Sequence, residues 1–119
     1  MKKFLAIYLG STSGSEMAEW MKMEEGQRKE KEAAGIKAWG AWMEKHKAAV
    51  VDQGGPLGKT KRTSKQGVSD TKNNMTGYVT IQAESHEAAA KMFENHPHFT
   101  RFPGEAVEIM ECLPIPGQR

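Results

Sequence analysis

The run Phe4-Leu5-Ala6-Ile7-Tyr8-Leu9, near the start of the chain, is apolar at every position. A strand with one face in water alternates apolar and polar residues, whereas a strand that is covered on both faces is apolar throughout. Gly10 ends the run. These residues therefore predict a central β-strand whose sheet has protein on both sides.

Lys2 and Lys3 precede this run and give it the look of a secretory signal peptide. Six apolar residues are fewer than the hydrophobic region of such a peptide, and no stretch approaches the roughly 20 residues of a membrane span. The single cysteine, Cys112, cannot form an internal disulfide. We therefore expect a cytoplasmic protein with no membrane partner.

The length and charge of the chain indicate how many domains it has and which partners are excluded. Its 119 residues fit a single domain, residues 1–119, with an ordered core of about residues 2–113. Seventeen basic and fifteen acidic side chains give a net charge of +2. This balance creates no strong field for polyanions, so we expect no nucleic-acid partner.

Helical patterns occupy the region after the first strand. Residues 16–24 read as an extra helical insert that begins at a cap on Ser13 or Ser15, and residues 27–32 read as a solvated connector. Apolar residues and one histidine then recur at steps of three and four, which predicts a longer helix that ends near Val51. That stripe consists of Ile36, Trp39, Met43, His46 and Val50.

The second half of the chain predicts three more strands and one helix. A basic edge strand starts at Pro56, a polar turn or loop covers residues 66–74, and residues 76–83 have the β-branched and aromatic enrichment of a strand. Ser85 begins a helix, which His96-Pro97 stops. The last strand spans residues 106–113.

The resulting order, β-α-β-β-α-β, is that of a ferredoxin-like α+β fold. Such a fold has a four-stranded antiparallel sheet with both helices on one face. The first and third strands look apolar on both sides, so the other face needs a cover. A second copy of the chain would supply it, and we therefore predict a homodimer in the form of a dimeric α/β barrel.

Five segments, spread over nearly the whole chain, share a pattern with a known family. They are residues 3–8, the Trp39 helix that leads into residues 51–58, Ala88-Ala89-Ala90-Lys91, His96-Pro97-His98-Phe99 and residues 107–110. Together they resemble the YCII-related family, close to its DGPF-like members. The resemblance implies a dimeric α+β barrel, and a cleft that holds a His and Asp pair in some members. Residues 16–23 depart from the shortest members.

His98 and His96 are the candidate catalytic residues, because the pKa of an unperturbed histidine, about 6.5, suits acid–base chemistry. Asp52 or a tyrosine hydroxyl could orient one of them. The structural alternative is that His96 caps the C-terminus of its helix and that His98 packs at the end of the sheet. A His-x-His pair offers only two metal donors, so we expect neither a metal site nor a cofactor.

The candidate ligand-binding residues are Tyr8, Tyr78, Trp39 and Lys59. The two tyrosines lie on central strands, Trp39 offers an aromatic wall, and Lys59 suits a carboxylate or phosphate. Core packing would equally explain Trp39, and protection of an edge strand would explain Lys59.

Two functional hypotheses follow from these residues. The first is a small-molecule enzyme or binding protein, in which a small organic ligand occupies a cleft and His98 or His96 moves a proton. The alternative is a non-catalytic dimeric interaction or regulatory module, with Trp20 and the Met-rich insert as its contact surface.

Overall fold

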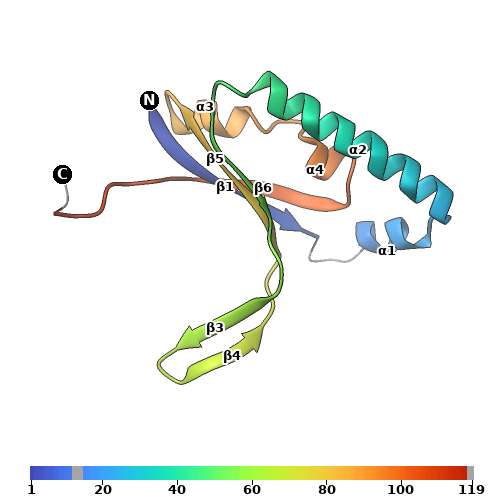
Figure 1. The fold of residues 1–119 in the computed structure, drawn as a ribbon, viewed down its shortest axis with the longest axis horizontal. Helices are drawn as coiled ribbons and strands as arrows, with labels where there is room; N and C mark the ends of the chain where they lie inside the picture. Colours follow the sequence, from blue (N-terminus) through green and yellow to red (C-terminus); the bar gives the residue numbers. More distant parts are fainter. Residues whose placement is uncertain (12–14, 118–119) are drawn as a thin grey trace.

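The computed structural model describes residues 1–11 and 15–117 (Figure 1). Strands and helices mix along the chain, as expected for an α+β protein. In chain order the elements are β1 (Lys2–Gly10), α1 (Ser15–Lys22), α2 (Glu25–Lys45), β2 (Val50–Pro56), β3 (Thr60–Ser64), β4 (Gly67–Thr71), β5 (Met75–Ala83), α3 (His86–Lys91), α4 (Pro97–Thr100) and β6 (Gly104–Glu111).

Four strands form the main sheet, in the order β2-β5-β1-β6, and each neighbouring pair is antiparallel. This is the strand order of a ferredoxin-like sheet, with β5 and β6 as its third and fourth strands. Figure 1 shows α2, α3 and α4 together on one side of the sheet. The predicted α+β class, the antiparallel sheet and the placement of the helices are confirmed.

The two faces of the sheet differ in cover. Along β1, Phe4, Ala6 and Tyr8 are buried, while the intervening Leu5, Ile7 and Leu9 stay partly exposed. Strand β5 alternates in the same way. The buried side chains of both strands share one core with residues of α2, α3 and the segment after α3, namely Trp42, Ala89 and Phe93. Within one chain, therefore, only the helical side of the sheet is closed.

Strand β2 departs from the prediction that the long helix continues to near Val51. That prediction was wrong, because α2 ends at Lys45 and residues 50–56 pair with β5. The pairing is irregular, with register shifts between Val50 and Asp52 and between Asp52 and Gly55. Bulged strands tolerate glycines, and the Gly54-Gly55 pair belongs to this strand.

Strands β3 and β4 form a separate antiparallel hairpin, which projects from the main sheet in Figure 1. We call residues 59–72 the arm. The predicted edge strand with Lys59 therefore lies in the arm instead of the sheet, and β4 occupies part of the predicted loop. Five basic side chains and one acidic side chain lie in the arm, whereas the rest of the chain has twelve basic and fourteen acidic ones.

The helices also begin and end differently from the prediction. Helix α2 begins at Glu25 and so includes the predicted connector. Trp42 and Gly35 are its buried residues, while Ile36 is 67% exposed, so the predicted stripe was partly wrong. The helix after Ser85 ends at Lys91, before His96. The insert is helix α1, and its proposed cap Ser13 lies outside the described residues.

None of the helices within residues 1–11 and 15–117 combines the length and the apolarity that are needed to cross a membrane.

Candidate functional site

A cluster of aromatic and histidine rings lies between β1 and the helices. The ring of Tyr8 lies 4.8 Å from the ring of Trp39, 5.1 Å from that of His96 and 5.2 Å from that of His98, measured between centroids. The ring of Trp42 meets that of His96 edge to face, with centroids 4.7 Å apart and an interplanar angle of 62°. Four of the predicted site residues, Tyr8, Trp39, His96 and His98, are thus in contact.

His96 is fully buried and caps the start of α4. Its Nδ1 accepts a hydrogen bond from the backbone N–H of His98 at 2.9 Å. Pro97 occupies the first turn, where its missing N–H is harmless. The prediction that His96 caps the C-terminus of the preceding helix is therefore wrong: Pro97 starts a helix here, and His96 is its N-cap.

His96 is held in its neutral form. Burial away from water lowers the pKa of His96 to about 3, with smaller contributions from the neighbouring His98 and His46. Its Nε2 lies 3.4 Å from the hydroxyl oxygen of Tyr8. Both ring nitrogens are thus engaged, and at neutral pH the ring carries no charge.

Tyr8 is 4% exposed, and burial raises the pKa of its hydroxyl well above the ordinary value of 10. The group is therefore a neutral phenol at any physiological pH. Its backbone carbonyl accepts a hydrogen bond from the hydroxyl of Thr76 at 3.0 Å, which ties β1 to β5 at this point.

His98 faces the backbone of β1. Its Nε2 lies 2.7 Å from the carbonyl oxygen of Leu9, which can only accept, so Nε2 carries the proton. Burial lowers the pKa of His98, and this hydrogen bond partly opposes the shift. A Cβ at Gly104 would collide with the His98 ring and its carbonyl group. The lack of a side chain at Gly104 thus makes room for His98.

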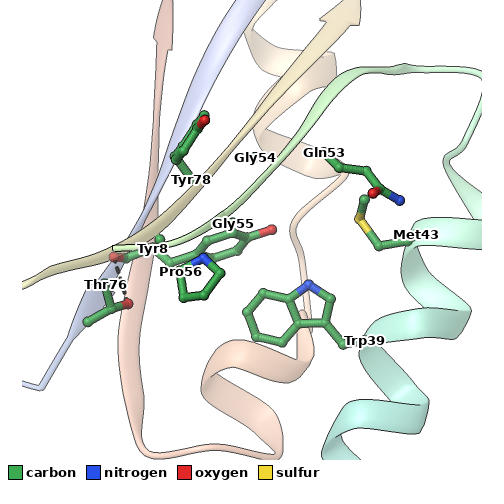
Figure 2. A pocket seen from close by; sticks show the side chains of 10 residues that line it. Tyr8, Trp39, Met43, Gln53, Gly54, Gly55, Pro56, Thr76 and Tyr78 are labelled. Carbon is green, nitrogen blue, oxygen red and sulfur yellow. Dashed lines mark hydrogen bonds between the residues drawn. The ribbon is translucent and has the colours of Figure 1, made fainter. Parts of the chain in front are cut away.

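A cavity of about 310 Å³ opens beside this cluster, between α2 and the irregular part of β2 (Figure 2). Its volume is at the small end of the range for ligand sites. Aromatic, apolar and glycine residues dominate its lining, which consists of Tyr8, Trp39, Met43, Gln53, Gly54, Gly55, Pro56, Thr76, Gly77 and Tyr78. We call this cavity the Tyr8–Trp39 pocket.

The rim of the pocket depends on the conformation of Gly54. This residue has φ of +63°, and a Cβ there would collide with the backbone carbonyl of Tyr78. Both facts require glycine. The Asp52 carboxylate accepts a hydrogen bond from the Gly54 N–H at 3.0 Å and so supports the same turn.

Three predicted site residues lie apart from the cluster. Asp52 is exposed, and in the described part of the chain it makes no hydrogen bond to either histidine. Lys59 belongs to the arm and does not line the pocket. Tyr78 lines the pocket at its edge, but its ring points away from Trp39 in Figure 2.

Sequence reasoning missed the contribution of β2 to the pocket. Gln53 and Pro56 line it because β2 runs beside Tyr8 at that point. The available signal was the Gly54-Gly55 pair, since glycines inside a strand often mark a bulge or a close approach.

Among residues 1–11 and 15–117, no group of three His, Cys, Asp or Glu side chains is placed to hold a metal ion.

Comparison with known proteins assigns no family. No family model matches the chain, and no curated protein matches it. Among solved structures, it is similar to 5-chloro-2-hydroxyhydroquinone dehydrochlorinase from Burkholderia phenoliruptrix AC1100, in complex with 2,5-dihydroxybenzoquinone. The two are 22% identical, the similarity covers 91% of this chain and 90% of that chain, and the TM-score is 0.49. Such a distant similarity carries no argument about activity, and membership of the YCII-related family stays a prediction.

Proposed function

We propose that this protein binds a small, flat and uncharged organic molecule in the Tyr8–Trp39 pocket. The observation that carries the proposal is a concave site of about 310 Å³ between two aromatic rings, with the Tyr8 hydroxyl at its wall. Aromatic walls favour flat ligands because ring faces and edges attract one another.

The charge of the pocket supports an uncharged ligand. None of the residues that line it carries a formal charge, and Tyr8 keeps its proton. A carboxylate or phosphate would lose its hydration here without meeting a cation, which is costly. Lys59, the residue that suits an anion, lies in the arm.

Binding is better supported than proton transfer by a histidine. His96 has both nitrogens engaged and a pKa lowered to about 3, so it is a poor base at neutral pH. The Nε2–H of His98 donates a hydrogen bond to the Leu9 carbonyl, so this nitrogen is not available to a ligand. Catalysis by His98 remains the weaker form of the proposal, and turnover that is lost in His98→Gln while ligand binding persists would support it.

The test uses thermal shift with neutral aromatic probes, because a ligand that binds only the native state raises its melting temperature. Acetophenone should stabilise the protein, and benzoate at the same concentration should not. Trp39→Leu should remove the effect. The matched control is Trp20→Leu, because Trp20 contacts Phe102 at 5.8 Å between centroids and does not line the pocket. Equal loss in both variants, or no shift with any neutral probe, would contradict the proposal.

We also propose that two copies associate through the open face of the sheet. Leu5 and Ile7 are only half-buried there, and Met110, the partner of Leu5 across β1 and β6, is 42% exposed. Covering this face would bury apolar surface, which favours association. Light scattering should show a dimer that Ile7→Lys converts to a monomer, while Val68→Lys in the arm leaves it dimeric. A wild-type monomer at high concentration would refute the dimer.

The interaction module stays the alternative function. Met17 and Met21 of α1 are 45% and 64% exposed, as a contact surface requires. A stable dimer that binds none of the neutral probes would favour this alternative over the pocket.

A further inference from the structure

We propose that the Tyr8 hydroxyl and the Trp39 indole N–H together form a two-donor site for one carbonyl oxygen, so that the pocket selects flat molecules with such an acceptor. This inference rests on the proposed function and names the class of ligand: conjugated or aromatic carbonyl compounds. The role of His96 is to direct the Tyr8 proton, which makes it a positioning residue.

The contacts of His96 determine which of its ring nitrogens carries the proton. A backbone N–H can only donate, and the His98 N–H lies 2.9 Å from Nδ1. Nδ1 must therefore present its lone pair. A neutral imidazole carries one N–H, so the proton of His96 lies on Nε2.

The position of this proton determines the direction of the hydrogen bond between His96 and Tyr8. Because Nε2 carries the proton, it donates to the Tyr8 oxygen across the 3.4 Å contact. The contact is long and hence weak. Its direction nevertheless leaves the hydroxyl proton of Tyr8 free to be donated elsewhere.

The hydroxyl proton of Tyr8 is directed into the pocket. In the described part of the chain, the Tyr8 hydroxyl has no hydrogen-bond partner besides His96. Tyr8 lines the pocket, and Figure 2 shows its hydroxyl directed toward the space between Trp39 and Gln53. A ligand that brings an acceptor into the pocket can receive this hydrogen bond, which favours its binding over that of a molecule without one.

Trp39 supplies the second donor. Figure 2 shows its indole nitrogen on the edge of the ring that faces Tyr8. Within residues 1–11 and 15–117, this N–H donates to no protein group, whereas the indole N–H of Trp42 donates to the Met92 carbonyl at 2.9 Å. An indole N–H cannot accept. Two donors that face the same space suit a carbonyl oxygen, which has two lone pairs.

The test compares acetophenone with ethylbenzene, which has nearly the same shape but no oxygen. Quenching of tryptophan fluorescence gives both dissociation constants. Acetophenone should bind about tenfold more tightly, as the gain of one to two hydrogen bonds implies. In Tyr8→Phe this preference should fall to about threefold, because the Trp39 N–H remains as one donor, while ethylbenzene binding is unchanged. The control is Thr63→Val in the arm, which removes a hydroxyl outside the pocket and should keep the preference.

His96→Asn tests the positioning role. Asparagine is a good N-cap and can still accept the His98 N–H, but it has no group that reaches the Tyr8 oxygen. The acetophenone preference should decrease, and ethylbenzene affinity, which a merely structural change would also alter, should stay constant.

A measurement without any ligand keeps the inference open to refutation even if the variants fold poorly. Long-range ¹⁵N–¹H NMR of the wild-type protein should show His96 with its proton on Nε2 at pH 7. A proton on Nδ1, or a preference for acetophenone that stays at its full wild-type value in Tyr8→Phe, would overturn the two-donor site while leaving the pocket in place. Binding of neither probe would overturn the proposed function and this inference with it.

Discussion

Tyr8 and Tyr78 lie on neighbouring strands of one sheet, yet they meet opposite environments. Tyr8 pairs with Gly77 and Ile7 pairs with Tyr78, so the two phenol rings leave the sheet on opposite faces. Tyr8 is 4% exposed beneath α2 and contacts two histidines, whereas Tyr78 is half-buried on the open face. One position along a strand therefore separates a candidate ligand-binding group from a surface side chain.

The same contrast extends to the whole sheet. On the covered face, rings and titratable groups pack together, and their burial favours uncharged forms. On the open face, the partly exposed side chains of β1 are aliphatic. The candidate site therefore lies on the side that the helices close. The other side mixes aliphatic residues of β1 with polar ones of its neighbours, such as Thr80 and Glu108.

The largest expected effect is on the free energy of unfolding, which an alanine substitution on the covered face of β1 should lower more than one on the open face. Phe4→Ala should lower the free energy of unfolding by about 3–5 kcal/mol, because Phe4 is fully buried under the helices. Leu5→Ala, on the open face, should cost about 1 kcal/mol. Urea unfolding at a concentration where the chain is monomeric measures both. Equal costs would mean that the open face is covered within the monomer, and the comparison of the two faces would fail.

Acidification should destabilise the covered face by up to about 4 kcal/mol. The pKa of His96 falls from 6.5 to about 3 on folding, so between these values the unfolded chain binds a proton that the folded chain does not. Stability is therefore complete above about pH 6.5 and is lost as the pH falls toward 3. His98, whose pKa is also lowered, acts in the same direction.

Unfolding midpoints in urea between pH 7 and pH 4 test this dependence. The control is His96→Asn, which removes the titrating group and should flatten the profile. A wild-type profile that stays flat down to pH 4 would show that His96 is protonated without cost, and hence that it is not sealed from water.

A smaller effect is expected from two glycine substitutions. Gly104→Ala should cost about 1–3 kcal/mol, because the new Cβ overlaps the His98 ring. Gly40→Ala is the matched control: it lies in α2 with no atom near the new Cβ, and should stabilise the helix by up to about 1 kcal/mol. Thermal unfolding compares the two. A neutral Gly104→Ala would indicate that His98 does not occupy the place described for it.

The regular parts of the fold were predictable from sequence, and the irregular parts were not. The patterns of β1, β5 and β6 identified three of the four sheet strands, because strand periodicity survives wherever burial is regular. The predicted second strand, from Pro56, lies in the arm instead. Strand β2 was missed because its bulges break that periodicity. The arm was read as an edge strand and loop, since exposed polar strands lack an apolar pattern.

The sequence identified most residues of the candidate site but not the contacts between them. Tyr8, Trp39, His96 and His98 were each identified, and the structure brings them into contact. Asp52 was expected near a histidine, but its carboxylate bonds a backbone N–H two residues away, a local choice that residue type alone does not reveal. Pro97 was interpreted as the end of the preceding helix, but proline is equally suited to the first turn of a helix, and here it begins α4.

The uneven charge of the arm makes the molecule an electric dipole. With net charges of +4 on residues 59–72 and −2 on the remainder, the protein presents opposite signs to its surroundings at its two ends. Such a protein can adhere to a cation exchanger and an anion exchanger at one pH, in different orientations. Its total charge of +2 therefore understates how strongly added salt will alter its retention.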